Sequence, residues 1–393
     1  STDDEDDDYS PPPRQAFHTE PDLCRAMLKT IEAAVPLAIK SSTISMGSGL
    51  FVTEPTEAGR EIYHSTPMVA CVDAGNPTFC HYCLDNSKDV SQFLRARETS
   101  SKACTGCWVA RFCSKEGGEL RVRSLKDIAA GEELSICYID PTITLHHRRY
   151  ILKHEYFFDC SCKGVRCKSE EKHISSLMKS NNGSLKSFTL AQDNIRRLVQ
   201  SARKACEHPG AYPKFEDLAS IETQIRTITT GTFSASKVWD GGLEPLPRAR
   251  LALAGLYMNQ GKLPSALRLA LQGILMSQWR SGPIWVNDVM DVLCVFILIW
   301  SSELDSPIFR VKNFPTMGDC CAVAAGYFYM VCKESNKAFG GSAKLTESLN
   351  DSFSGLISKK PGAKPGSAEF ADEFNKAQAN MLAWASIPKE MGI

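Results

Sequence analysis

Residues 111–124 read RFCSKEGGELRVRS, and the two halves of this stretch have different characters. The left half ends a run of closely spaced cysteines and resembles part of a zinc-binding knuckle. The right half alternates apolar with polar or basic residues over GELRVRS, which predicts a β-strand. The join at residues 116–118 therefore places an incomplete metal-binding segment directly before a strand.

The cysteines to the left of the join have zinc-ligand spacing. Cys80 and Cys83 form one pair, Cys104 and Cys107 form a second pair, and Cys113 follows. A gap of two residues lets both thiolates of a pair face one tetrahedral Zn²⁺. Free buried cysteines would explain one pair, but two pairs followed by Cys113 favour zinc.

A third cysteine group lies further along the chain, at Cys160, Cys162 and Cys167. These residues supply three thiolates, whereas a closed structural zinc site needs four ligands. His173 is near in sequence, but a histidine at this position is equally well explained as a solvated surface residue.

To the right of the join, residues 118–140 (GELRVRSLKDIAAGEELSICYID) predict a strand, a turn at Ala130-Gly131 and a second strand. Residues 45–72 (SMGSGLFVTEPTEAGREIYHSTPMVACV) contain two turn signals and two β-branched runs, which predict a hairpin. Residues 22–40 have the apolar spacing of a helix.

From about residue 171 the apolar spacing becomes helical. Residues 246–279 predict two helices joined at Gly261–Pro264, and their small and aromatic residues resemble one tetratricopeptide helical hairpin. The apolar run VLCVFILIW, residues 292–300, is shorter than a membrane span and predicts a buried helix. Residues 358–367 predict a linker, followed by a last helix over about 368–386.

The overall composition excludes several classes of protein. The 393 residues include 45 Lys+Arg and 45 Asp+Glu, so no net positive field attracts nucleic acid or an anionic membrane. Six of the first eight residues are acidic, which predicts a disordered tail. The acidic start does not resemble a secretory signal, so the 16 cysteines indicate metal binding in a reducing compartment, nucleus or cytoplasm.

Taken together, three stretches resemble the SET-and-MYND (SMYD-like) family of protein-lysine methyltransferases. GSGLFVTEPTEAGREIYHSTPMVAC resembles the opening strands of a SET domain, and CHYC…CTGCWVARFCSKE resembles the first half of a MYND zinc finger inserted in it. GGELRVRSLKDIAAGEELSICYID…HEYFFDCSCKGVRC resembles the end of the SET domain with its post-SET cysteines. The resemblance covers about residues 45–167.

This resemblance implies an S-adenosylmethionine (SAM)-dependent methyl transfer to a protein lysine, histone or non-histone, and assigns roles to single residues. Gly47 and Gly49 match the turn whose backbone approaches SAM, and Tyr138 matches the catalytic tyrosine of the lysine channel. Phe158 matches an aromatic residue beside the cofactor. On sequence alone, a plain turn explains the two glycines, and core packing explains Phe158 equally well. The eight cysteines named above would be the zinc ligands.

The resemblance also shows what is missing at the join. Gly117 stands where the family has the next finger cysteine, and an Asn-His-Ser sequence, which contacts the cofactor in the family, occurs nowhere in this chain. The neighbouring cysteine that usually completes the post-SET zinc site is also absent. Because both flanks match the family up to the join, an excised exon or a faulty gene model explains the gap better than slow degeneration.

We therefore expect an α+β protein: a small SET-type β-fold with a zinc-finger insertion, followed by an all-α, tetratricopeptide-like domain. The expected division is 1–20 acidic tail, 21–140 incomplete SET domain with a partial MYND finger at 80–117, 141–170 post-SET region, 171–357 helical domain, and 358–393 linker and terminal helix. The function expected is a lysine methyltransferase, impaired by the missing loop. The alternatives are a non-catalytic scaffold that binds proteins through the finger and helices, and a zinc-stabilised helical protein of another role.

Overall fold

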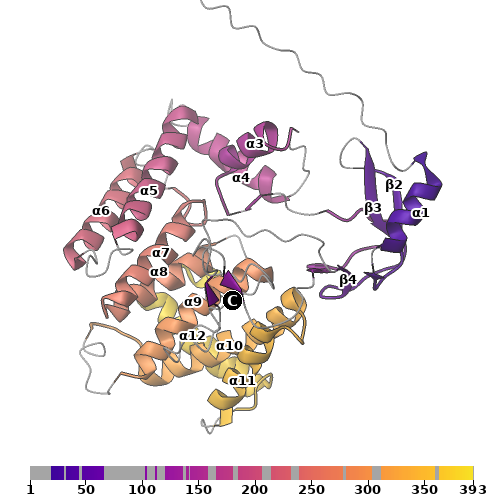
Figure 1. Cartoon of the computed structure of the whole chain (residues 1–393). Coiled ribbons are helices and arrows are strands. Elements are labelled where there is room, and N and C mark those ends of the chain that lie inside the picture. Colours follow the sequence, from indigo (N-terminus) through magenta and orange to yellow (C-terminus); the bar gives the residue numbers. More distant parts are fainter. Residues whose placement is uncertain are drawn as a thin grey trace, which may run out of the picture. The chain divides into compact units, whose positions relative to one another are not determined.

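The computed structural model describes residues 19–30, 32–43, 47–65, 102–103, 111–112, 120–135, 139–140, 142–157, 165–179, 185–205, 214–231, 239–277, 280–302, 311–358 and 363–392. The chain divides into two compact units (Figure 1). The first is a mixed unit that contains the described residues up to 135, and the second is a helical unit that contains those from 139 onward. Within the described residues the protein is mostly helical with small sheets, as an α+β composition predicts.

The mixed unit begins with helix α1 (Pro21–Thr30) and is otherwise built from short antiparallel strands. A three-stranded sheet has the order β1 (Glu32–Ala33), β4 (Glu61–Ser65), β7 (Leu120–Arg123). A separate pair joins β2 (Leu37–Ser41) to β3 (Ser48–Val52), and a two-residue ladder joins β5 (Lys102–Ala103) to β6 (Arg111–Phe112).

The pairing of β4 with β7 brings together the two pieces of sequence that flank the cysteine-rich stretch. Tyr63 pairs with Val122 and Ser65 with Leu120, in antiparallel register. Beyond the strand end, Ser124 continues the contact: its amide donates to the carbonyl of Arg60 at 3.0 Å. The strand that begins just after the join is therefore an integral part of the sheet that begins before it.

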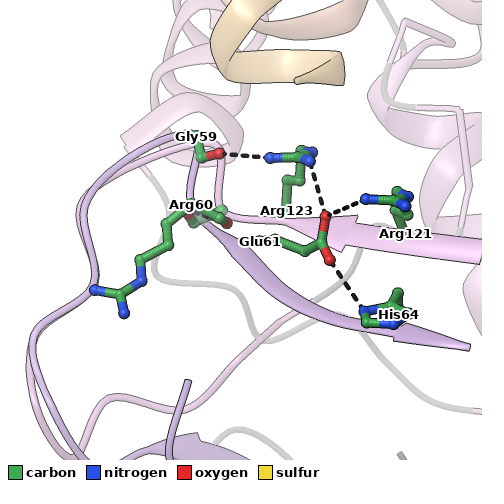
Figure 2. Close-up of polar contacts among 7 residues, drawn as sticks. Gly59, Arg60, Glu61, His64, Arg121 and Arg123 are labelled. Atoms are coloured by element: carbon green, nitrogen blue, oxygen red, sulfur yellow. Dashed lines mark hydrogen bonds and ion pairs between the residues drawn. The ribbon is translucent and has the colours of Figure 1, made fainter. Parts of the chain in front are cut away.

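A cluster of charged side chains reinforces this pairing (Figure 2). Oε2 of Glu61 on β4 accepts hydrogen bonds from Arg121 at 3.1 Å and from Arg123 at 2.8 Å, both on β7. Nδ1 of His64 lies 3.1 Å from Oε1 of the same carboxylate. Arg123 also donates to the carbonyl oxygen of Gly59 at 3.1 Å. Glu61 and Arg123 are only 17% and 16% exposed, so solvent screens this ion pair less than an exposed one.

The small core of the mixed unit draws on both pieces of sequence. Val35, Val52 and Ile62 come from before the cysteine-rich stretch, and Ile128 comes from after it. Val122 and Leu134, also from after the stretch, pack against the same core. Burial of these apolar side chains is the main favourable contribution to folding of such a unit, so neither piece can form this core without the other.

Two of the sequence predictions for this unit are wrong in part. The helix predicted over residues 22–40 ends at Thr30, and the chain continues into β1 and β2. Pro36 disfavours a helix that runs through residues 35–36, because it lacks an amide hydrogen and disfavours a helical conformation in the preceding residue. The predicted hairpin within residues 45–72 does contain strands β3 and β4, but β3 pairs with β2, and β4 pairs with β1 and β7.

After β7 the sequence predicted a turn and then a second strand, and the structure confirms the turn more fully than the strand. A turn lies at Ala130–Gly131, as predicted, and Gly131 has a φ of 78°, which favours glycine. In the described part of the expected second strand, pairing is limited to an isolated bridge between Glu133 and Phe51. The remainder of that predicted strand lies outside the described residues.

The helical unit contains a series of helices whose positions follow the apolar spacing of the sequence (Figure 1). They are α3 (Leu145–His154), α4 (Val165–Lys179), α5 (Leu185–Ala205), α6 (Phe215–Gly231), α7 (Leu246–Asn259), α8 (Leu263–Met276), α9 (Gly282–Trp300), α10 (Met317–Phe339), α11 (Lys344–Ser358) and α12 (Ala368–Trp384), with a short 3₁₀ turn at Lys389–Met391.

The helix pair α7–α8 confirms the prediction for residues 246–279. Gly261 turns the chain between the two helices with a φ of 67°. Ala266 and Ala270 are buried, and a Cβ at Gly273 would overlap Leu251 on the facing helix, so small residues permit the close approach. Tyr257 is buried and donates a hydrogen bond of 2.6 Å to Glu222 on α6.

Helix α9 carries the apolar run that was predicted to be buried. Val286, Val289, Val292 and Ile299 are each fully buried in the helical unit. Among the described residues, α9 is also the one helix long and apolar enough to cross a membrane, judged by length and composition, but 56% of its most apolar window is buried. The burial favours a core helix of this unit, as the sequence predicted.

We expect substitution of Glu61 by Gln to destabilise the protein by about 1–2 kcal/mol, because the charge-assisted hydrogen bonds from β7 are weakened. Glu54→Gln is the matched control, since Glu54 is exposed. Urea unfolding at low and high salt measures both effects. An equal, small effect of the two substitutions would show that the Glu61 cluster contributes nothing to the joining of the two pieces.

Candidate functional site

The turn that connects β2 to β3 in the mixed unit ends at Gly47, and Gly49 follows as the second residue of β3. The amide of Ser42 donates to the carbonyl of Gly47 at 2.9 Å and closes the turn, while Lys40 pairs with Gly49 at its base. Gly47 has a φ of 106°, a backbone conformation that is strained for any residue with a side chain. The space where its Cβ would lie is open. A ligand can therefore approach the backbone closely at Gly47, which fits the cofactor turn that the resemblance implies.

The surroundings of Gly49 are different, because the protein fills them itself. A Cβ at Gly49 would overlap the carboxylate of Glu133. That carboxylate reaches past Gly49 to the start of the turn, where it accepts hydrogen bonds from Ser42 and Thr43. Packing against Glu133 therefore explains the glycine at position 49 without any ligand.

Glu133 belongs to a segment that lies alongside β3. The amide of Gly131 donates to the carbonyl of Val52 at 2.8 Å, and the amide of Leu134 donates to the carbonyl of Leu50 at 2.7 Å. This segment leads toward Tyr138, which lies outside the described residues. The glycine turn and the start of the segment that carries Tyr138 are therefore neighbours in space.

The first helices of the helical unit flank the residues expected beside the cofactor and the third zinc site. Phe158, Cys160 and Cys162 lie outside the described residues, between α3 and α4. Arg148 on α3 donates a hydrogen bond of 2.7 Å to Glu170 on α4, and the two side chains are 8% and 2% exposed. This buried pair fixes α3 against α4.

One predicted zinc ligand, Cys167, lies on the backbone of α4. The predicted ligands of the finger lie outside the described residues: Cys80, Cys83, Cys104, Cys107 and Cys113. Among the described residues there is no group of three or more His, Cys, Asp or Glu arranged to hold a metal.

The short ladder β5–β6 concerns the predicted finger directly. Ala103 pairs with Arg111 and Lys102 with Phe112. Cys104 therefore directly follows one paired strand in sequence and Cys113 directly follows the other. Cysteine thiolates are preferred zinc ligands, so the donor set fits zinc chemically, and the pairing shows that the sequence neighbours of these two cysteines lie side by side.

His173 is not the solvated surface residue that one interpretation expected. Its Nε2 atom is buried and makes no hydrogen bond to the part of the chain that the structure describes. However, His173 and Cys167 both lie on α4, and six residues correspond to a rise of about 9 Å along a helix. This separation disfavours a shared zinc ion, so His173 stays outside the proposed ligand set.

Sequence reasoning missed Glu133, Ser42 and Thr43 as members of this site. Glu133 is one of two adjacent glutamates after the turn at residues 130–131, and neither position carries a recognisable motif by itself. The side chain of the neighbour Glu132 bonds locally, to Lys126 at 2.5 Å and to the amide of Ala129 at 3.0 Å. The hydrogen bond from Lys126 and that from Ala129 lower the pKa of Glu132.

With this geometry established, comparison with known proteins indicates a class. No family model matches the chain. Residues of the chain are 31% identical over 105 residues to the histone-lysine N-methyltransferase SMYD3 of Mus musculus, and 33% identical over 146 residues to the histone-lysine N-methyltransferase SET5 of Meyerozyma guilliermondii. The histone-lysine N-methyltransferase Smyd1 of Mus musculus is 23% identical over 205 residues.

These matches are partial on both sides. They cover 27%, 37% and 48% of this chain and only 21%, 27% and 41% of SMYD3, SET5 and Smyd1 respectively. The chain therefore resembles the class of protein-lysine N-methyltransferases with a SET domain. Within that class its resemblance is to the SMYD-like proteins and the SET5 proteins, as its motifs indicated.

We expect Gly49→Ala to destabilise the protein by about 1–3 kcal/mol, because the new methyl group displaces the Glu133 carboxylate from its hydrogen bonds. In a Glu133→Ala background the same substitution should cost less than about 0.5 kcal/mol, since the obstruction is gone. Urea unfolding of the four proteins of this double-mutant cycle measures the coupling. Additive costs would contradict the close approach of Glu133 to Gly49.

Proposed function

We propose that the chain is a SET-type, SAM-dependent protein-lysine N-methyltransferase whose cofactor binding is weakened by the missing Asn-His-Ser segment. The single observation that supports it best is the mixed unit itself. In this unit an open glycine turn lies beside the segment that leads to Tyr138, and the strands come from both sides of the cysteine-rich stretch.

In this proposal SAM supplies the methyl group when bound, and the chain supplies alignment and exclusion of water. The Gly47–Gly49 turn would hold the cofactor through its backbone. Tyr138 would orient the neutral amine of the substrate lysine through its hydroxyl group, and Phe158 would pack beside the cofactor. These three roles rest on the resemblance of the surrounding motifs.

The proposed substrate is a lysine side chain of a protein, histone or non-histone, met in the nucleus or the cytoplasm. The curated relatives are named as histone-lysine methyltransferases, which supports the lysine but does not choose the acceptor protein. Further protein partners would bind through the finger and the tetratricopeptide-like helices. The well-packed α7–α8 pair supports such a helical repeat.

The chemistry of the cysteines supports zinc as a structural component of the finger, whereas the three post-SET thiolates lack the fourth ligand that a closed site needs. The thiolate is a preferred zinc ligand, and a structural zinc ion contributes on the order of 10 kcal/mol to folding. With the second half of the finger absent, Cys80, Cys83, Cys104 and Cys107 form one complete set of four ligands. Cys113 would then be spare.

A non-catalytic scaffold is the second candidate function. The absence of Asn-His-Ser from the sequence favours it, because the cofactor would lose contacts that the family makes through this segment. The helical unit, with its extensive buried core, would serve as a protein-binding domain in either case.

We expect the purified chain to bind SAM with a dissociation constant weaker than about 100 μM, because part of the expected binding surface is missing. Isothermal titration calorimetry measures it directly. Micromolar binding would contradict the proposed impairment. Methyl transfer to a lysine peptide, lost on Tyr138→Phe, would contradict the scaffold alternative.

We expect about one zinc ion per chain in protein purified without added metal, held by the four cysteines at 80, 83, 104 and 107. Cys80→Ser should lose this zinc and lower the melting temperature, whereas Cys113→Ser should keep it. Elemental analysis by mass spectrometry gives the stoichiometry. Three zinc ions per chain would show that this assignment of ligands is wrong.

A further inference from the structure

The Glu133 carboxylate is hydrogen-bonded to residues far away in sequence, and this link has no role in the proposed methyl transfer itself. Its Oε1 accepts from the hydroxyl of Ser42 at 2.7 Å. Its Oε2 accepts from the amide of Thr43 at 2.6 Å and from the hydroxyl of Thr43 at 2.7 Å. Both oxygens are therefore engaged, and both partners lie in the same turn, 90 and 91 positions earlier in the chain.

One end of this link is the turn proposed to receive the cofactor. Ser42 and Thr43 open that turn, and the amide of Ser42 closes it by bonding to the carbonyl of Gly47. The carboxylate also fills the space above Gly49, so it touches the turn at its beginning and near its end. These contacts restrict the backbone on both sides, at residues 42–43 and at residues 47–49.

The other end of the link is the segment that leads to the proposed catalytic tyrosine. Glu133 lies five positions before Tyr138, and its backbone neighbours Gly131 and Leu134 are hydrogen-bonded to Val52 and Leu50 on β3. Because this segment is anchored to β3, the side chain of Glu133 can hold Ser42 and Thr43 in a fixed position relative to β3.

We propose that Glu133 is a positioning residue for the cofactor: its carboxylate holds Ser42 and Thr43 next to Gly49 and so keeps the backbone at Gly47 and Gly49 in the position that binds SAM. This role rests on the proposed function. A preordered turn does not have to lose conformational freedom on binding, so the link increases cofactor affinity without contact between Glu133 and the cofactor.

The substitution Glu133→Gln tests this role with little change in side-chain size. A glutamine that points its amide oxygen at Thr43 must point its amide nitrogen at Ser42, so the Ser42 hydroxyl has to change from donor to acceptor. The hydrogen bonds also lose the charge of the carboxylate, so the link is weakened. Glu132→Gln is the matched control, because the Glu132 side chain is adjacent in sequence but bonds locally, to Lys126 and the amide of Ala129.

The experiment uses the full chain with its zinc and S-adenosylhomocysteine as the probe, titrated to millimolar concentration and followed by ligand-detected NMR. All variants are compared at a temperature at which circular dichroism shows them fully folded, so that a loss of global stability cannot change the measured affinity. Hydrogen exchange of peptides that span residues 42–49 is measured on the same samples without ligand.

We expect Glu133→Gln to weaken binding about fivefold to tenfold and to accelerate exchange in the turn, whereas Glu132→Gln changes neither. Equal affinity of wild type and Glu133→Gln would overturn the positioning role and leave the proposed function intact. Equal weakening by both substitutions would also overturn it. Failure of the wild type to bind the probe at all would overturn the proposed cofactor class and this role with it.

Discussion

The antiparallel pairing of β4 with β7 is the constraint on which the rest of the mixed unit depends. The two strands are separated in sequence by the whole cysteine-rich stretch, yet Tyr63 pairs with Val122 and the Glu61 carboxylate holds both arginines of β7. The core residues Val52 and Ile62 meet Ile128 from the other side of the same stretch, and a bridge between Thr56 and Ile128 adds to this contact. Closing so long a loop costs conformational entropy, which the shared core and the ion cluster must offset.

This pairing explains how the strands on the two sides of the join form one sheet although the sequence contains no Asn-His-Ser segment. The join at residues 116–118 falls just before β7, in a place where no described strand is interrupted. The sheet, the glycine turn and the Glu133 link all lie on the residues that remain. What the chain lacks is the Asn-His-Ser sequence, which in the resembling family contacts the cofactor, so the expected loss concerns ligand binding more than folding.

Much of the helical unit could be predicted because helical spacing is a local signal. The pair α7–α8, the buried helix α9 and the last helix α12 all appear where the spacing placed them, since each needs only a continuous apolar face and a turn residue such as Gly261. In the mixed unit strands β3, β4 and β7 were foreseen, but β1 and β2 fall mostly in a stretch predicted to be helical, and the strand partners were not foreseen. Strand pairing joins residues that are far apart in sequence, and a period of two residues does not specify which strand lies alongside.

The same reasoning separates the predictable and unpredictable parts of the candidate site. Gly47 and Gly49 were selected through the family resemblance, since on sequence alone a plain turn explains them. Glu133 could not be selected from the sequence, because its importance comes from reaching two residues about 90 positions away. The predicted Tyr138, Phe158 and zinc-binding cysteines depend on motif resemblance, and their side chains lie outside what the structure describes.

The most direct measurement of the central claim is native-state hydrogen exchange of the amides in β4 and β7. If the two separated pieces form one sheet, the amides of both strands that donate to the ladder will be protected and will open together, with the same dependence on denaturant. Protection of β4 while β7 exchanges at the rate of an unfolded chain would show that the piece after the join is not part of the sheet.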